Sequence, residues 1–203
     1  MSVTKRLIAG AIALAAITGF AVPTVQAQTA QQLDWCYGKD GATPDLTIGG
    51  CTAAIQSGKY DGKDLAAFFV RRGAAYSNKG EFDRAIQDYD QAIKLNPNRA
   101  AAFYNRGIDY RNKGQTDRAI QDYDQAIKLD PSFAQFFNNR GSAYHHKGEP
   151  DRAIQNYDQA IKLNPTYAAA FFNRSLAKEK MGDKAGAEAD LAAARKIDPK
   201  IGK

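Results

Sequence analysis

The chain has 203 residues, of which 44% are hydrophobic and 25% are charged, and its 28 basic and 22 acidic residues give a formal net charge of +6 at pH 7. The basic excess is small, Lys and Arg are interleaved with Asp, and no run of about five like charges provides a track for a polyanion. We therefore expect no nucleic-acid partner.

The first 27 residues have the pattern of a secretory signal peptide. Lys5 and Arg6 precede an apolar stretch over residues 7–22, and Val25 and Ala27 flank one position before an expected cleavage point. An uncleaved membrane anchor is the alternative, but the stretch is shorter than the roughly 18 residues that usually span a bilayer. We expect cleavage after Ala27 and a periplasmic or secreted mature protein with no membrane span. Loss of the two cations lowers the formal charge from +6 to about +4.

The chain contains two cysteines, Cys36 and Cys51. The leader would send them to a compartment in which thiols oxidise, so we expect a disulfide between them. Closing a loop of about 15 residues should stabilise the fold by about 3 kcal/mol if the chain-entropy account holds. Two free thiols, or half of a metal site, are the alternatives.

A 13-residue phrase recurs in the rest of the sequence. It begins at Asp83, recurs unchanged at Asp117, and returns at Asp151 with one substitution, Asn156 in place of aspartate, so that the step is 34 residues each time. Repetition at one fixed spacing indicates stacked units, in which each unit covers an apolar face of the next. Function is therefore expected on a surface and not in a buried pocket.

Each unit has the periodicity of two helices. The stripes of the first unit are Phe69, Gly73 and Tyr76, followed by Ala85, Ile86, Tyr89, Ala92 and Ile93. Gly80 separates the two helices and Pro97 breaks the chain after the second. Helices of about 14 residues are marginal in isolation, so we expect glycine and alanine notches to pack against aromatic rings of neighbouring helices.

These units resemble tetratricopeptide repeats, which are helix-turn-helix modules of 34 residues. The signature positions of that family are filled in the first unit by Phe69, Gly73, Tyr76, Ala85, Tyr89, Ala92 and Pro97, and the same residue types recur in the second and third units. The resemblance implies an all-α fold, a right-handed α-solenoid of stacked helix-turn-helix units. The units are expected at residues 66–99, 100–133, 134–167 and 168–201.

Both ends of the array are expected to be caps. The fourth unit has Ser175, Lys178 and Leu191 in place of the signature glycine and two tyrosines, and we interpret it as a degenerate capping repeat with a polar outer face. Residues 28–65 are expected to form an N-terminal helical cap that the disulfide staples. Its two short helices are expected at Gln32–Gly38 and Gly49–Gly58, around a loop over residues 39–48.

The resemblance also implies a place for a ligand. In tetratricopeptide repeats, the first helices of the units line a concave groove that receives an extended peptide or a partner helix. The residues expected in this groove are Arg71, Tyr104, Asn105, Ile108, Arg111, Asn138, Asn139, Ser142, His145, Phe172, Asn173 and Leu176. We therefore expect a protein or peptide ligand, and no cofactor.

Three of these residues, Asn105, Asn139 and Asn173, lie one repeat apart. Their amides could pair with the backbone of an extended ligand whatever its side chains, or they could bond to neighbouring helices or water. Arg71 and Arg111 would favour acidic ligands.

Some family members bind the carboxyl termini of chaperones with a clamp that requires a lysine and an asparagine. Val70 and Ala74 stand at those positions here, so we do not expect a chaperone-tail receptor.

Other polar residues are expected to be structural. The arginines that precede the glycine position are Arg72, Arg106, Arg140 and Arg174. We expect them to pair with Asp88, Asp122 and their equivalents, and an anion-binding stripe is the weaker alternative. His145 and His146 are adjacent on one helix, which is poor geometry for a metal site without converging carboxylates. No nucleophile elbow, phosphate loop or catalytic triad is recognisable, so we expect no enzymatic activity.

The sequence thus predicts an exported, non-catalytic scaffold that holds a protein segment in a concave groove. Two alternatives stay open: a structural protein that self-associates into homo-oligomers by end-to-end stacking, and a binder of anionic polymers through its net positive charge.

Overall fold

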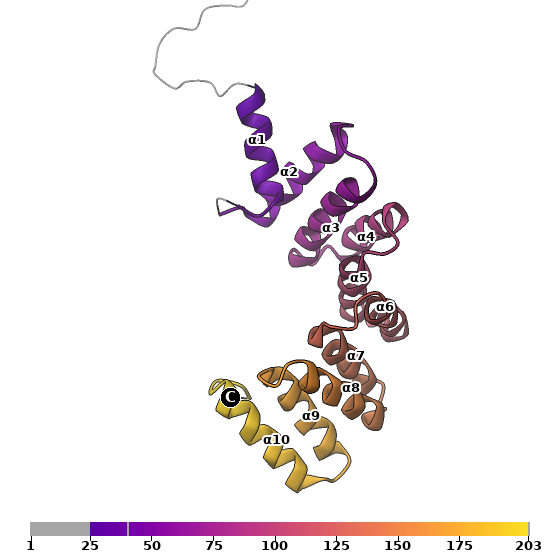
Figure 1. Cartoon of the computed structure of the whole chain (residues 1–203), viewed down its shortest axis with the longest axis vertical. Helices are drawn as coiled ribbons and strands as arrows, with labels where there is room; N and C mark the ends of the chain where they lie inside the picture. Colours follow the sequence, from indigo (N-terminus) through magenta and orange to yellow (C-terminus); the bar gives the residue numbers. More distant parts are fainter. Residues whose placement is uncertain (1–24, 40, 203) are drawn as a thin grey trace, which may run out of the picture.

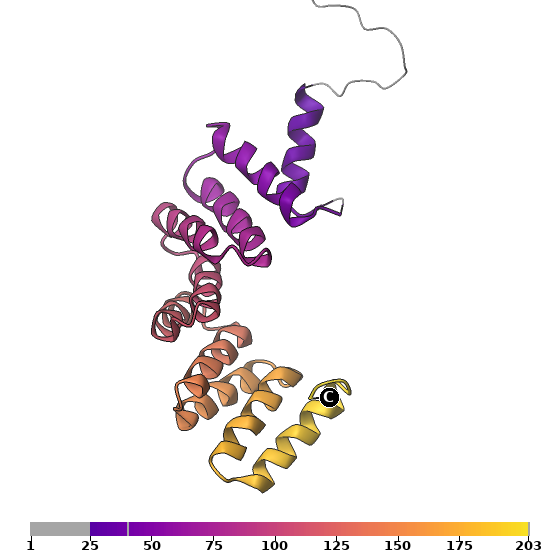
Figure 2. The ribbon, with the colours of Figure 1, turned by 180° about the vertical axis from the view of Figure 1, so that it is seen from behind.

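The computed structural model describes residues 25–39 and 41–202, and all regular structure in these ranges is α-helical. The ten helices found there are α1 (Val25–Cys36), α2 (Pro44–Gln56), α3 (Gly62–Asn78), α4 (Phe82–Leu95), α5 (Ala100–Asn112), α6 (Thr116–Leu129), α7 (Ala134–His146), α8 (Pro150–Leu163), α9 (Ala168–Lys180) and α10 (Lys184–Ile197). From α3 onward they form successive pairs, and the pairs stack along a curved path (Figure 1). The view from behind shows the same elongated array, with α1 and α10 at opposite ends (Figure 2). The prediction of an all-α solenoid is confirmed.

The two helices of each pair are joined by a turn that requires glycine. Gly80 has φ 76°, a left-handed conformation that residues with a side chain rarely adopt. Its amide donates to the carbonyl of Ser77 at 2.9 Å and the amide of Glu81 donates to that of Tyr76 at 3.0 Å, which is a Schellman ending for α3. The equivalent glycines of the later pairs have the same sign of φ, so one turn geometry recurs along the array.

The helices of a pair approach closely because a glycine faces a tyrosine. A Cβ added to Gly73 of α3 would lie 2.8 Å from a ring carbon of Tyr89 on α4, closer than real contacts allow. Gly107 and Gly141 meet their own tyrosines in the same way. Tyr89 and its equivalents are fully buried. The predicted packing of glycine notches against aromatic rings is confirmed.

The four arginines expected to be structural do tie helices together. Arg106 of α5 binds both carboxylate oxygens of Asp122 on α6, at 2.8 and 2.7 Å, and its third nitrogen binds Asp90 on the preceding α4. Arg72 binds Asp88 in the same two-pronged way and reaches Thr52 of α2. Each such arginine joins three helices, so the anion-stripe alternative is not needed to explain them.

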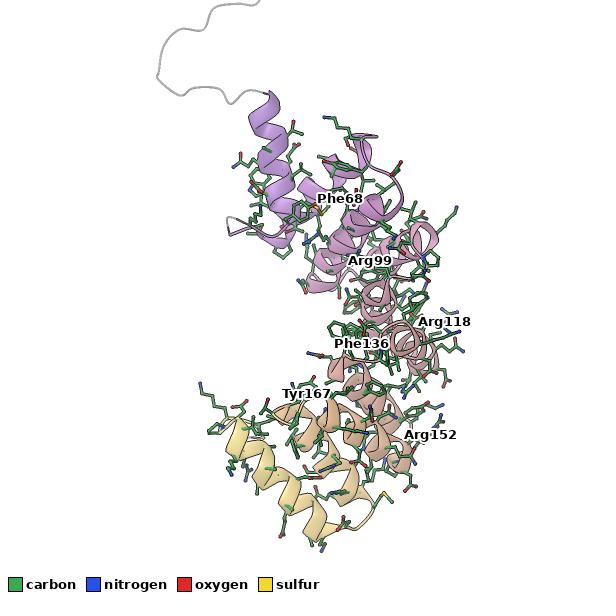
Figure 3. All side chains as sticks on the ribbon, in the orientation of Figure 1. Phe68, Arg99, Arg118, Phe136, Arg152 and Tyr167 are labelled. Atoms are coloured by element: carbon green, nitrogen blue, oxygen red, sulfur yellow. A yellow bond between two sulfur atoms is a disulfide. The ribbon has the colours of Figure 1, made fainter. Side chains whose placement is uncertain are left out.

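The N-terminal cap is a helix pair joined by the disulfide between Cys36 and Cys51. Both cysteines are buried together with Phe68 of α3, which Figure 3 labels where the cap meets the first repeat. The cap helices are longer than the sequence suggested, because α1 already begins at Val25 and α2 at Pro44. The early start of α2 has a local cause, since Thr43 accepts a hydrogen bond from the amide of Leu46 and proline suits the first helical turn.

The expected signal peptide lies mainly outside the described residues, which begin at residue 25. It therefore stays a prediction. Cleavage after Ala27 would fall in the first turn of α1. Within the described ranges, no helix has both the length and the hydrophobicity that a membrane span needs.

Candidate functional site

The inner side of the curve is lined by the first helices of the pairs. Figure 3 places Phe136 of α7 and Tyr167 on the inner side, and Arg118 of α6 and Arg152 of α8 on the outer side. The residues expected in the groove lie on α3, α5, α7 and α9. Most of them are half-buried, and Leu176 is exposed. The half-buried side chains are held in place by packing, and their exposed parts remain accessible to a ligand.

One expected groove residue is not accessible. Asn138 is only 5% exposed, and its amide oxygen accepts a hydrogen bond from Nδ2 of Asn173 at 3.0 Å. It therefore links α7 to α9. Its place on α7 suggested an exposed position, but packing against the next repeat covers it.

The expected ladder of three free amides is mostly engaged within the protein. Asn139 donates to the hydroxyl of Tyr104 at 2.6 Å and accepts from Arg111 at 3.2 Å. Asn173 is bound to Asn138. Only Asn105 makes no side-chain hydrogen bond to another described residue. For two of the three asparagines the structure thus favours the alternative of bonds between helices.

Aromatic side chains form the middle of the groove. The rings of Tyr104 and Phe136 have centroids 4.7 Å apart, and Phe133 stacks on Phe136 at 5.1 Å. Phe133 is 48% exposed, which is unusual for so large an apolar residue. Burial raises the pKa of Tyr104, so its hydroxyl stays protonated. The result is a rigid apolar platform with a fixed polar edge at Tyr104 and Asn139.

Phe133 was not among the residues expected in the groove. It lies one residue before α7, and Arg99 and Tyr167 occupy the same place before α5 and α9, at the 34-residue spacing. Figure 3 shows Tyr167 on the inner side. The sequence therefore did contain an indication of these residues, namely their 34-residue spacing. They lie in the loops, whereas the resemblance directed attention to the helices.

A cavity of about 250 Å³ lies at the N-terminal end of the groove, between the cap and α3. Arg71 of α3 forms one wall, with its guanidinium carbon 4.5 Å from the ring centre of Tyr37. Thr47 of α2 and Asn78 of α3 also line it. Tyr37 and Thr47 were not expected at the site, because nothing in the sequence indicates how the cap docks on the first repeat.

A second depression of about 180 Å³ adjoins this cavity and shares Ala74 and Asn78 with it. Its other walls include Ser77, Asn105 and Ile108. We call these two adjoining hollows, which reach from the cap to α5, the trough. Asn105, the one free asparagine of the expected ladder, lies in this trough.

Beneath the trough lies a buried carboxylate. Asp109 of α5 is fully buried, and one of its oxygens accepts a hydrogen bond from the hydroxyl of Ser77 at 2.6 Å, while the other has no partner among the described residues. Burial raises its pKa to about 6, and the hydrogen bond from Ser77 opposes this shift.

The histidines show no sign of metal binding. Burial and the nearby Lys180 lower the pKa of His145, so the imidazole is neutral at pH 7. Over the described ranges, no three residues among the His, Cys, Asp and Glu side chains converge as metal ligands.

Comparisons with known proteins agree with this architecture. Family models described as tetratricopeptide repeat match residues 66–99, 104–168 and 147–200. No sequence among the curated proteins matches this chain.

Several solved structures have a similar fold. A crystal structure of MamA is 20% identical over 89% of this chain and 98% of its own, with a TM-score of 0.69. MamA 41-end from Desulfovibrio magneticus RS-1 is 18% identical over 87% of this chain and 95% of its own, with a TM-score of 0.72. The first TPR of Spaghetti (RPAP3), bound to HSP90 peptide SRMEEVD, is 21% identical over 62% of this chain and 99% of its own, with a TM-score of 0.59. At these identities the likeness concerns the fold alone.

Proposed function

The chain belongs to the tetratricopeptide repeat family, and from this premise we propose that it is a non-catalytic scaffold whose concave groove binds a segment of a partner protein. The observation that carries the proposal is the exposed ring of Phe133, held by stacking on Phe136 at the centre of the groove. A large apolar side chain that is both exposed and fixed is a typical anchor of a binding surface.

The surroundings of this ring suit an extended peptide. A peptide backbone carries both donors and acceptors, and the free amide of Asn105 can satisfy one of each. The trough beside Asn105 continues toward the cap, so a ligand bound at Asn105 could reach Arg71. One structural neighbour is bound to a peptide, SRMEEVD, but this chain has Val70 and Ala74 where a chaperone clamp needs polar side chains. Its ligand is therefore expected to be held by residues other than those of that clamp.

Peptide selection tests the proposal. Residues 28–203, with the disulfide formed, are used to select binders from a random peptide display library. Phe133→Ala and Asn105→Ala are each expected to lower the affinity for the selected peptides by about tenfold or more, because each removes a groove contact and leaves the fold intact. Leu163→Ala, which removes an exposed leucine from the outer helix α8, is the matched control and should not change the affinity. Failure to select any peptide, or equal binding by all four proteins, would contradict the proposal.

Export is part of the proposal and rests on the leader sequence. The full-length chain, expressed in a bacterial host, is expected in the periplasmic fraction or medium with Gln28 as its first residue. Mass spectrometry of the purified protein measures this directly. A protein that keeps residues 1–27 would contradict it.

Self-association is a second candidate, favoured by an open groove between α9 and α10. This groove of about 230 Å³ is lined by Phe172, Leu176 and Leu191 together with charged residues. The equivalent face of each earlier pair is covered by the first helix of the next unit. The face of the last unit that no further repeat covers thus carries apolar as well as charged side chains, and a helix of a second copy could cover it. Sedimentation that stays monomeric over a wide concentration range would reject this candidate.

A further inference from the structure

The cavity between the cap and α3 contains a cation, Arg71, that has no counter-ion among the described residues. Arg71 is half-buried, its Nε is buried without a hydrogen-bond partner, and none of its nitrogens forms an ion pair with a described residue. Its neighbour Arg72 shows the contrast, since it binds Asp88 twice and Thr52 once. Removing a guanidinium from water without giving it a partner is unfavourable. An anion that binds Arg71 would therefore offset this desolvation penalty.

The position of Arg71 is fixed in advance of any ligand. Its guanidinium lies over the ring of Tyr37 at 4.5 Å, an arrangement favoured by the ring electrons, and Tyr37 belongs to the segment that the disulfide at Cys36 holds. A pre-positioned donor loses less conformational freedom when it binds. The cap therefore contributes directly to the site.

Two acidic residues of the cap are already engaged, and Asp40, between the lining residues Gly38 and Ala42, lies outside the described residues. Asp34 binds Lys39 at 3.0 Å, and Asp45 binds Lys79. No acidic residue is among the described lining residues of the cavity, whose other polar side chains are Tyr37, Thr47 and Asn78. The cavity thus presents one positive charge and three neutral groups that can donate hydrogen bonds.

From this arrangement we infer that the cavity is a carboxylate pocket that anchors an acidic residue or the free carboxyl end of a peptide in the groove. One guanidinium with three neutral donors matches the single charge of a carboxylate, whereas a phosphate dianion would leave charge uncompensated. The volume suits one side chain. Because the pocket opens into the trough beside Asn105, the rest of the peptide would run from Arg71 toward Ile108. The inference rests on the proposed function for the ligand class, a peptide.

Nuclear magnetic resonance of the mature, disulfide-bonded protein tests the pocket with small probes. The Nε–H signal of Arg71 is followed while four compounds are added separately: N-acetylglutamate α-amide, which has only a side-chain carboxylate; N-acetylglycine, which has only a terminal one; N-acetylglutamine α-amide, which is neutral; and inorganic phosphate. A saturable shift is expected with the carboxylates and not with the neutral probe. Whichever of the two carboxylate probes binds more tightly shows whether the pocket prefers a side-chain carboxylate or a terminal one.

Variants of the pocket residues provide the control for this experiment. Arg71→Gln is expected to lower the affinity for the tighter-binding carboxylate probe by about tenfold or more, since a charge-assisted hydrogen bond is lost. Arg71→Lys should retain part of the binding, and Thr47→Val tests the pocket if Arg71→Gln does not fold. Stronger binding of phosphate, no shift of Arg71 with any carboxylate, or equal affinity in Arg71→Gln would each overturn the inference.

The pocket and the proposed function can fail separately. If display peptides bind the wild type and Arg71→Gln equally well, the groove function stands and the pocket assignment is wrong. If no peptide is selected but the carboxylate probes shift Arg71, the pocket stands and the peptide scaffold is wrong.

Discussion

Arg140 donates a single hydrogen bond to Asn156, from Nε to Oδ1 at 2.7 Å, where the equivalent arginines of the neighbouring repeats bind a carboxylate through two nitrogens. Asn156 is also the one position at which the third copy of the 13-residue phrase departs from the first two. Its amide donates to the carbonyl of Arg152, and in the described part of the chain Arg140 has one ion pair, with Asp124. The third repeat therefore lacks one of the charge-assisted bonds that join helices elsewhere.

Asn156→Asp is expected to restore this bond. The new carboxylate can turn both oxygens toward Arg140, and because the guanidinium is only partly exposed, the free energy of unfolding should rise by about 1 kcal/mol. Urea unfolding at pH 7 measures the change. Asp122→Asn is the mirror-image control and should lower stability by a similar amount. An unchanged or lower stability of Asn156→Asp would show that Arg140 is already satisfied by its present partners.

The repeat core could be predicted from the sequence because it is periodic. The pairing of Gly73 with Tyr89 depends only on the 34-residue spacing and on helical geometry, so three copies of one pattern were enough to place it. The pairing of Arg72 with Asp88 was predicted for the same reason.

The groove could be predicted only in outline. Its location follows from which helix of each pair faces inward, but the partners of Asn139 depend on Tyr104 and Arg111, which occur in one repeat only. The early start of α2 and the contact of Arg71 with Tyr37 involve the cap, which does not share the repeat pattern. Where the sequence stops repeating, each contact depends on a particular neighbour, and periodicity gives no information about it.

The disulfide should stabilise the cap more than the repeats. Replacing Cys36 and Cys51 by serine removes a cross-link over about 15 residues and should cost about 3 kcal/mol of cap stability. The repeats keep their own contacts, so hydrogen exchange should become faster in α2 while α6 and α8 are little affected. Reduction of the wild type with dithiothreitol should reproduce the effect. Equal exchange in the oxidised, reduced and double-serine proteins would contradict this prediction.

A larger residue should be tolerated at the glycine of each notch only if the facing tyrosine is also replaced by a smaller residue. A Cβ at Gly141 would lie 2.7 Å from a ring carbon of Tyr157, so Gly141→Ser is expected to reduce the free energy of unfolding by about 2 kcal/mol. The fourth unit already has a serine at this position, Ser175, and it carries Leu191 where the tyrosine would stand. The smaller leucine leaves room for the Cβ.

A double-mutant cycle tests this coupling. Tyr157→Leu alone should be destabilising, but Gly141→Ser should cost much less in the Tyr157→Leu background than in the wild type, with a coupling energy of about 1 kcal/mol or more. Thermal or urea unfolding of the four proteins provides the values. Additive effects would mean that the ring moves aside freely and that the notch does not require glycine.

Asp109 should make the stability of the protein depend on pH. The first, third and fourth units have alanine at its position, namely Ala75, Ala143 and Ala177, whereas Asp109 is buried with one oxygen unpaired. Its pKa is raised by burial from 3.8 to about 6. The residues that face it are Ser77, Tyr89 and Tyr123, and burial also raises the pKa of both tyrosines, so they stay neutral through this range.

Asp109→Asn should therefore stabilise the protein at neutral pH and not in acid. Between about pH 4 and pH 6 the native state holds a proton that the unfolded chain releases, so wild-type stability falls as the pH rises through this window and the loss is complete above it. The asparagine variant does not titrate, and its free energy of unfolding should exceed that of the wild type by about 3 kcal/mol at pH 7 while matching it near pH 4. Urea unfolding at a series of pH values, with Asp109→Ala as a second non-titrating variant, measures the difference. If the gap between Asp109→Asn and the wild type is the same at pH 4 and pH 7, the pKa of Asp109 does not differ between the native and unfolded states and the burial argument fails.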